Sequence, residues 1–365
     1  TRLRTVTGVQ TCALPISFSG WSVGFPLAGV AALAAAFAGV ALPIALVLAL
    51  LIGCTFASVH HAETLAHRLG ALFGSLVLAL AISVIGAGLI VSMMLAGDQP
   101  ELARDSIFSA LLIALNGILG VCLLLGGGRH YEQNFRVSAS NAFLSVLVPL
   151  SFLTLMLPSY TLSVPGPVFS TPQLIFVAVV SFVLYVLFLY VQLVRHRNDF
   201  IADHEVESGA PRPSARVALV ALAILIAALV SVVLLAKVLS PVLEASVAAA
   251  GLPKAVVGVA IAALVLMPEG LTAIRAARRN RLQTALNLTL GSVLACVGLT
   301  IPAVAITALV TGQSLHLGLN EPMTVLLLCT FLTLSFTLNT GRSTVLEGFV
   351  HLAIFAAFIL FTLLP

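Results

Sequence analysis

One glutamate lies deep inside an apolar stretch of the sequence, where a charge needs an explanation. Glu269 is the only charged residue between Lys254 and Arg275. A carboxylate at the centre of a bilayer costs at least about 2.5 kcal/mol on insertion scales, so it normally faces a cavity or a partner rather than lipid. Pro268 removes a helix amide and Gly270 loosens the backbone, so we expect an interrupted helix whose carbonyls could bind an ion beside the carboxylate. A carboxylate that holds either a proton or a cation, but not both, provides the simplest chemistry for antiport.

Few other polar residues lie deep in the apolar stretches around Glu269. A hard cation such as Ca²⁺ takes about six to eight oxygen ligands, which carboxylate, amide, hydroxyl and backbone groups can supply together. Asn116 is the strongest further ligand candidate, because a buried amide needs several partners. A serine or threonine in a membrane helix is more often bonded to its own helix. The candidate ligands are Ser83, Asn116, Asn287, Thr289, Ser292 and Thr300, with backbone carbonyls near Gly86 and Pro268.

The elements that must position these residues are membrane spans. The 365 residues are 60% hydrophobic and 8% charged, with a mean hydropathy of +1.17, which is typical of a polytopic membrane protein and leaves no soluble domain. Apolar runs of about 18 to 25 residues recur, each long enough to cross about 30 Å of hydrocarbon. We predict an all-α protein with eleven transmembrane helices, at residues 22–39, 40–59, 73–97, 107–127, 142–159, 174–194, 217–240, 254–274, 285–310, 322–339 and 344–364.

The basic residues indicate the topology. Of the seventeen lysines and arginines, twelve lie in connections that follow even-numbered spans and three in connections that follow odd-numbered spans. Positive charge is enriched on the cytoplasmic side of membrane proteins. We therefore expect a cytoplasmic N-terminus, a periplasmic C-terminus and an odd number of spans in a bacterial inner membrane.

A hydrophilic linker divides the chain into two halves. Residues 195–216 are expected to form a cytoplasmic linker between a first repeat at 40–194 and a second repeat at 217–365. Five spans on each side of the linker force the halves into opposite orientations, which is the arrangement of inverted repeats in secondary transporters. Residues 22–39 form an extra first helix, and residues 1–21, which include no initiator methionine, are expected to be a non-native or truncated segment.

Two other groups of residues have a plainer interpretation. The five cysteines are isolated and are expected to be small packing residues. His60, His61 and Glu63 could form a metal or pH-sensing cluster, but an interfacial helix start on the cytoplasmic face is favoured over that interpretation. Glu347 and His351 lie one helical turn apart and are expected to pair.

Several motifs together resemble one transporter family. They are Pro268-Glu269-Gly270, the Asn287 to Ala295 stretch with Gly291-Ser292, Arg68-Leu69-Gly70, Leu123 to Gly127, and Thr340 to Gly348 followed by His351. From about residue 40 to its end, the chain resembles bacterial calcium/proton antiporters of the ChaA type, in the calcium/cation antiporter superfamily. The resemblance implies eleven helices with two inverted five-helix repeats, each of which contributes one acidic helix to a central site. Glu269 matches the acidic residue of the second repeat, Gly291 and Ser292 match its Gly-Ser element, and Asn116-Gly117 matches the corresponding place in the first repeat.

The chain departs from this family at Gly86. Family members that resemble this stretch carry a glutamate there, so one of two central negative charges is missing. If the glycine is natural, we expect weakened Ca²⁺ transport or a shift toward monovalent exchange, because a divalent ion would be poorly neutralised. The alternative is a single-base error, which converts a glutamate codon into a glycine codon.

The sequence as a whole favours a secondary antiporter that exports Ca²⁺ or Na⁺/K⁺ in exchange for H⁺ by alternating access. The lipid bilayer is its expected environment, and neither a cofactor nor a nucleic-acid partner is expected. The sequence contains no nucleotide-binding fingerprint, HExxH motif or GxSxG motif, so an ATP-driven pump and an intramembrane enzyme are disfavoured. A passive channel is also less favoured, because the internal repeat suits two rocking halves better than a pore.

Overall fold

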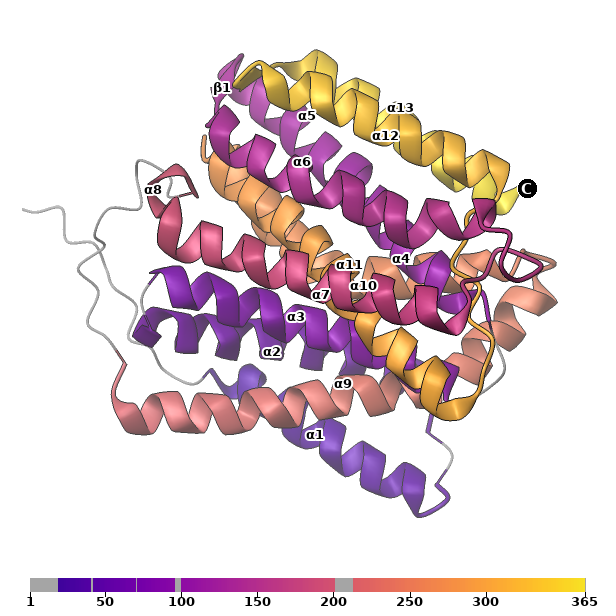
Figure 1. Cartoon of the computed structure of the whole chain (residues 1–365). Helices are drawn as coiled ribbons and strands as arrows, with labels where there is room; N and C mark the ends of the chain where they lie inside the picture. The colour runs from indigo at the N-terminus through magenta and orange to yellow at the C-terminus, as the bar shows by residue number, and fades with distance from the viewer. Residues whose placement is uncertain (1–18, 41, 70, 96–99, 201–212, 365) are drawn as a thin grey trace, which may run out of the picture.

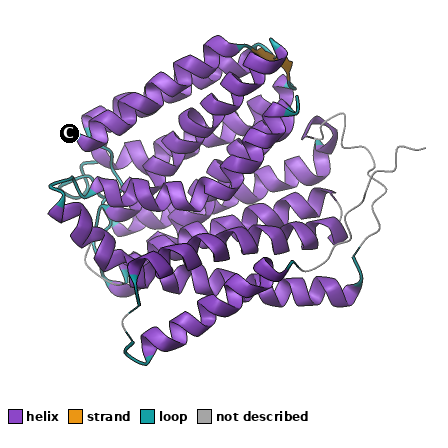
Figure 2. Cartoon of the chain, turned by 180° about the vertical axis from the view of Figure 1, so that it is seen from behind, coloured by secondary structure: helices purple, strands orange, loops and turns teal. Residues whose placement is uncertain are grey.

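The protein is a bundle of long helices that run side by side (Figures 1 and 2). The computed structural model describes residues 19–364, except residues 41, 70, 96–99 and 201–212. The expected segment at residues 1–21 therefore lies almost entirely outside the described residues, as does most of the acidic part of the linker. The helices are α1 (Gly20–Phe37), α2 (Ile44–Leu69), α3 (Ala71–Met94), α4 (Leu102–Leu112), α5 (Leu119–His130), α6 (Val137–Ser151), α7 (Thr171–Tyr190), α8 (Arg197–Phe200), α9 (Ala215–Ala249), α10 (Ala255–Arg278), α11 (Leu282–Thr311), α12 (Glu321–Asn339) and α13 (Val345–Leu363).

The predicted spans are confirmed as helices. A π-helical stretch at Ile113–Ile118 joins α4 and α5 into one span, Leu102–His130. Among the described residues, ten helical segments are long and apolar enough to cross a membrane, and α3 supplies an eleventh helix, of 24 residues. The chain is thus an all-α polytopic membrane protein, as predicted.

The ends of two spans differ from the prediction. α2 continues to Leu69 and α9 to Ala249, each about ten residues beyond the expected end. His60, His61 and Glu63 therefore lie within α2 and do not begin a new helix. His61 is fully buried, and its Nε2 lies 3.0 Å from the carbonyl oxygen of Ser22 in α1. Packing against α1 gives these polar residues partners, so the helix continues where hydropathy alone indicates an end.

Contacts between helices follow an inverted repeat. α3 packs against α11, and its counterpart α10 packs against α4 and α5. Likewise α7 packs against α11, while its counterpart α13 packs against α5, and the first helices of the two halves, α2 and α9, pack against each other. Each of these contacts has a counterpart in which the two halves change places, so the fold consists of two inverted five-helix repeats. α1 lies outside this pattern, at the edge of the bundle against α2 and α9 (Figure 1).

The connections between helices show the same relation. At one end of the bundle, strand β1 (Gln133–Asn134), between α5 and α6, pairs antiparallel with strand β2 (Arg342–Ser343), between α12 and α13. At the other end, Val168, between α6 and α7, forms an antiparallel bridge with His316, between α11 and α12. We call these the Gln133 end and the Arg104 end, after the residues that dominate the polar contacts there.

The four cysteines among the described residues are unpaired, as expected for packing residues. Cys54 and Cys122 are buried, Cys296 is half-buried and Cys329 is exposed. Cys12 lies outside the described residues.

Candidate functional site

Glu269 lies in the middle of α10 and is buried, with 7% of its surface exposed. The prediction of an interrupted helix is wrong, because α10 runs unbroken from Ala255 to Arg278 through Pro268. A proline inside a helix removes one N–H, which would have bonded the carbonyl oxygen of Leu264 four residues earlier. One missing hydrogen bond leaves the rest of the helix intact, and the carbonyl oxygen that lacks its usual donor is that of Leu264, one turn before Pro268.

The polar partner of Glu269 is a hydroxyl. Ser292 in α11 donates a hydrogen bond from its Oγ to Oε2 of Glu269, and Ser292 is itself buried, with 6% of its surface exposed. None of the ion pairs formed by the described residues includes Glu269. A carboxylate whose partner is neutral keeps its charge uncompensated, so it is suited to hold a proton or a cation.

Replacing Ser292 with alanine is expected to raise the KM for the transported cation about tenfold, while the maximal rate falls less. A hydrogen bond to a charged group contributes about 1.5 to 3 kcal/mol, and about 1.4 kcal/mol corresponds to a factor of ten. Initial rates of cation flux at varied cation concentration measure the change.

Thr289→Val is the matched control for this change. Thr289 lies about one turn earlier on α11 and is also buried, but its Oγ1 donates to the carbonyl oxygen of Ala285 in its own helix, at 2.6 Å. The Thr289→Val protein should keep the wild-type KM. An unchanged KM in Ser292→Ala would show that the hydroxyl does not contribute to cation binding.

A close helix contact lies beside the carboxylate. A Cβ atom on Gly270 would lie 2.9 Å from Cδ1 of Ile118, which is too close for an ordinary contact. Ile118 ends the π-helical stretch between α4 and α5. The glycine after Glu269 thus allows α10 to approach the first repeat closely at the level of the site.

Gly86 also faces α10 near Glu269. A Cβ on Gly86 would lie 3.6 Å from Cγ1 of Val265, which is an ordinary van der Waals distance. Val265 precedes Glu269 by four residues, or about one helical turn. The position at which the resemblance places the missing carboxylate therefore adjoins the site and accepts a Cβ atom without a clash.

The structure does not bring the Asn116 amide to Glu269. Nδ2 of Asn116 donates to Oγ1 of Thr330 in α12 at 2.8 Å, and Oδ1 lies 2.9 Å from Nδ1 of His351 in α13. Nε2 of His351 lies 3.1 Å from Oγ1 of Thr337, so the imidazole is held on both sides. This buried network joins α12 and α13 to the π-helical stretch. A role for Asn116 as a cation ligand stays a prediction.

Glu347 and His351 interact electrostatically, as expected, but no hydrogen bond or ion pair joins them. Oε2 of Glu347 accepts hydrogen bonds from the backbone N–H of Thr344 at 2.8 Å and from its Oγ1 at 2.5 Å, and so caps its own helix. Both ring nitrogens of His351 have other partners, as described above. The spacing of one turn was correct, but the helix terminus offers Glu347 unpaired N–H groups that are closer.

Two further predicted residues of α11, Asn287 and Gly291, lie toward the Gln133 end. Nδ2 of Asn287 donates to the carbonyl oxygen of Phe200 at 2.6 Å, and its Oδ1 accepts from Gln283 at 2.9 Å. A Cβ on Gly291 would lie 3.8 Å from the ring of Phe143. These residues hold the neighbouring helices together, and their contact with the Glu269 carboxylate stays a prediction.

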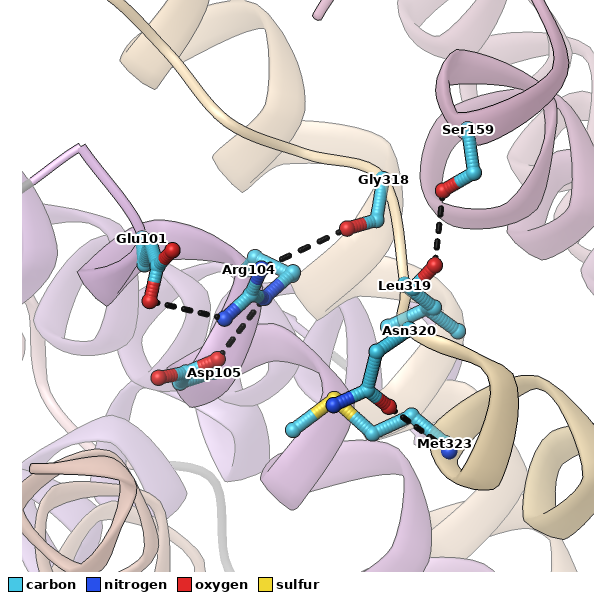
Figure 3. Close-up of polar contacts among 8 residues, drawn as sticks. All are labelled: Glu101, Arg104, Asp105, Ser159, Gly318, Leu319, Asn320 and Met323. Carbon is cyan, nitrogen blue, oxygen red and sulfur yellow. Dashed lines mark hydrogen bonds and ion pairs between the residues drawn. The ribbon is translucent and has the colours of Figure 1, made fainter. Parts of the chain in front are cut away.

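Sequence reasoning missed a buried charged group at the Arg104 end. Arg104 and Asp105, at the start of α4, are both mostly buried, and Arg104 contacts two carboxylates and a carbonyl oxygen (Figure 3). The signal was present in the sequence, because three charged residues stand directly before the apolar run of this span. Their contact with the second repeat could not be predicted from the sequence.

The described residues include no group of three or more histidine, cysteine, aspartate or glutamate side chains placed to hold a metal ion. At Glu269 the structure brings together one carboxylate and the Ser292 hydroxyl. Hard cations such as Na⁺, K⁺ and Ca²⁺ accept such ligands.

Comparisons with known proteins agree on one family. The sodium/calcium exchanger protein family matches residues 39–194 and 220–364. The chain is 48% identical over 319 residues to y4hA, a candidate ionic transporter of Sinorhizobium fredii, with 87% of each chain covered. It is 36% identical over 316 residues to the sodium-potassium/proton antiporter ChaA of Escherichia coli, with 85% of this chain and 86% of that protein covered.

Solved structures show the same fold. The H⁺/Ca²⁺ exchanger CAX superposes with a TM-score of 0.70 at 15% identity, with 93% of this chain and 87% of that chain covered. Native YfkE superposes with a TM-score of 0.69 at 19% identity, with 94% of this chain and 100% of that chain covered. By its sequence matches over most of its length, the chain belongs to the sodium/calcium exchanger family of the calcium/cation antiporter superfamily.

Proposed function

We propose that the protein is a secondary active transporter that exchanges cytoplasmic Ca²⁺ or Na⁺/K⁺ for external protons by alternating access. The observation that carries the proposal is the buried Glu269 carboxylate, whose partner is the Ser292 hydroxyl. Two names among the relatives support the same exchange, since ChaA is named a sodium-potassium/proton antiporter and CAX an H⁺/Ca²⁺ exchanger. Family membership and the absence of catalytic motifs from the sequence both favour a transporter over an enzyme.

Glu269 is the shared ligand in this proposal. When it is ionised, the carboxylate, the Ser292 oxygen and the freed carbonyl of Leu264 can bind a cation. When it is protonated, the negative charge that would hold the cation is gone. The two occupants exclude each other, so passage of one across the membrane is coupled to return of the other.

The other predicted residues support the site in different ways. Gly270 allows the close approach of α10 to Ile118, Gly86 faces Val265 of α10 at an ordinary distance, and Pro268 removes the N–H that would bond the Leu264 carbonyl. Asn116 holds the π-helical stretch through its bonds to α12 and α13, and π-helical segments are frequent at functional sites. Gly291 and Asn287 lie nearer the Gln133 end of α11, against Phe143 and Phe200.

The proposed orientation follows the basic residues. The Gln133 end carries Arg129, Arg136, Arg278 and Arg342, and we place it in the cytoplasm of a bacterium, with the Arg104 end in the periplasm. Repeat 1 then comprises residues 40–194 and repeat 2 residues 217–365, joined by the cytoplasmic linker 195–216. This places the N-terminus in the cytoplasm and the C-terminus in the periplasm.

The single carboxylate favours monovalent cations among the possible substrates. One negative charge neutralises Na⁺ or K⁺ but leaves Ca²⁺ with a net charge in a buried site, which is costly. Transport that is weak for Ca²⁺ and stronger for Na⁺ or K⁺ is therefore the form of the proposal that Gly86 favours.

The test uses purified protein in liposomes with an imposed pH gradient. We expect cation uptake into acid-loaded liposomes that saturates with cation concentration, stops when a protonophore removes the gradient, and exceeds uptake into protein-free liposomes. Na⁺, K⁺ and Ca²⁺ are compared in parallel. Uptake that does not saturate and does not depend on the pH gradient would indicate a channel and contradict the proposal.

A further inference from the structure

The connection between α11 and α12 crosses the Arg104 end of the bundle as a strap. α11 ends at Gly312, whose φ of 71° turns the chain across this end in a conformation that favours glycine. Leu315, Leu317 and Leu319 point into the bundle and are buried. We call residues 312–320 the 312–320 strap.

The strap is bonded to both sides of the first repeat. On one side, the N–H of His316 donates to the carbonyl oxygen of Pro100 at 2.9 Å, in the connection between α3 and α4. On the other side, the N–H of Gly318 donates to the carbonyl oxygen of Pro167 at 3.0 Å, and the hydroxyl of Ser159 donates to the carbonyl oxygen of Leu319 at 2.7 Å. A segment of repeat 2 thus closes this end of repeat 1.

Arg104 is the side chain that holds the strap from below (Figure 3). Its Nη1 donates to the carbonyl oxygen of Gly318 at 3.4 Å. Its Nε and Nη2 form ion pairs with Asp105 at 2.8 Å and with Glu101 at 3.1 Å. Two carboxylates therefore fix the orientation of the guanidinium toward the strap. The pair with Asp105 is buried on both sides, whereas the Glu101 side chain is exposed and adds less.

The strap lies over the helix seam that leads to Glu269. A Cβ on Gly258 of α10 would lie 3.1 Å from Cβ of Asp105, so α10 and α4 are in close contact just below the strap. Glu269 is eleven residues further along α10, about 16 Å deeper at 1.5 Å per residue. The seam between α4 and α10 thus connects the Arg104 end to the level of the site.

The Gln133 end carries the counterpart of this strap. Residues 131–136, the connection between α5 and α6, hold the turn between α10 and α11. Nε2 of Gln133 donates to the carbonyl oxygen of Ala277 at 2.9 Å and to Oδ1 of Asn280 at 3.1 Å, and the N–H of Arg136 donates to Oε1 of Gln283 at 2.7 Å. The same connection of each repeat thus closes the other repeat, but a neutral amide acts at one end and an ion-paired guanidinium at the other.

We propose that these two straps are the gates of alternating access, and that Arg104 is the positioning residue that keeps the 312–320 strap closed. The seam opens toward the Arg104 end when Gly318 leaves the guanidinium. Residues 131–136, which we call the Gln133 strap, open the opposite end in the same way. This inference deepens the proposed exchange by naming what seals each end of the path to Glu269.

Thiol labelling tests the inference without measuring transport. The five native cysteines are replaced by alanine, and a single cysteine is introduced at Ser106 or at Ser140. Both serines are buried, with 2% and 1% of their surface exposed, and neither hydroxyl has a hydrogen-bond partner in the structure. Ser106 follows Asp105 against Gly258, and Ser140 lies near the start of α6 at the Gln133 end. A membrane-impermeant maleimide is applied to each side of oriented vesicles.

Arg104→Gln is expected to raise the labelling rate of Ser106→Cys several-fold from the Arg104 side and to leave Ser140→Cys no more reactive from the Gln133 side. Gln133→Ala should raise the labelling rate of Ser140→Cys from the Gln133 side and leave that of Ser106→Cys from the Arg104 side unchanged. Arg104→Lys should give an intermediate rate, because one ammonium group cannot bridge both carboxylates and the carbonyl. Elution on size exclusion and the melting temperature show which variants are folded.

Gly318→Ala is a second variant that leaves Arg104 and its carboxylates intact. A Cβ at this position would lie 2.7 Å from Cβ of Pro167, so the strap must shift. It should raise Ser106→Cys labelling as Arg104→Gln does. Unchanged labelling in both variants, or an equal rise at both ends, would overturn the gating role. Because labelling needs no transported ion, such a result would leave the proposed exchange standing.

Discussion

Replacing Glu269 with glutamine is expected to reduce proton-coupled cation flux to the level of protein-free liposomes. Glutamine has nearly the same shape and can still accept a hydrogen bond from Ser292, so packing around α10 should be retained. It can neither ionise to neutralise a cation nor exchange a proton, so both halves of the cycle are lost. The measurement is cation uptake into acid-loaded liposomes.

Glu347→Gln is the matched control for the Glu269 change. Glu347 is also a glutamate in an apolar helix, but it caps the start of α13 through Thr344. Glutamine serves in the same capping arrangement, so this variant should fold and transport like the wild type. A Glu269→Gln protein that transports normally would remove the central residue of the proposed mechanism.

Replacing Gly86 with glutamate is expected to raise Ca²⁺ flux at least about tenfold relative to Na⁺ flux. A second carboxylate beside Glu269 supplies the charge that a divalent ion needs, and a gain of about 1.4 kcal/mol in binding corresponds to a factor of ten. The backbone accepts a side chain at this position, because the added Cβ makes an ordinary contact with Val265 at 3.6 Å. Parallel flux assays with the two cations measure the ratio.

Gly86→Gln separates charge from size in this experiment. Glutamine has the length of glutamate without its charge, so it should leave the ratio of Ca²⁺ to Na⁺ flux near the wild-type value. If Gly86→Glu and wild type exchange Ca²⁺ equally well, the position does not set the cation preference. A higher ratio of Ca²⁺ to Na⁺ flux in both variants would show that the effect comes from the size of the side chain and not from its charge.

The sequence predicted the spans well because hydropathy is a local property. All eleven expected runs are helices, and the inverted repeat followed from their number and from the distribution of arginine. The ends of α2 and α9 could not be predicted in this way. His61 lies inside α2 with a buried carbonyl partner in α1, and that contact spans 39 residues.

The part of the site that depends on local sequence could also be predicted. The cost of a buried charge identified Glu269 from its own surroundings, and its bond to Ser292 joined two of the predicted residues. Asn116 was correctly expected to need several partners, but those partners are Thr330 and His351, which are 214 and 235 residues away. Which face of a helix a polar side chain uses depends on helix crossings that one sequence does not reveal.

The contact of Gly270 with Ile118 bears on how the bundle can move. At this contact the Ile118 side chain packs against the bare backbone of Gly270, and such a contact resists sliding because neighbouring side chains would collide within one residue of travel. Rotation about the contact point is easier, so we expect α10 to tilt about this point. Glu269 is one residue from the Gly270 contact, so it moves little when α10 tilts, while the two ends of α10 move much further. The carboxylate can then stay in place while the membrane face that reaches it changes.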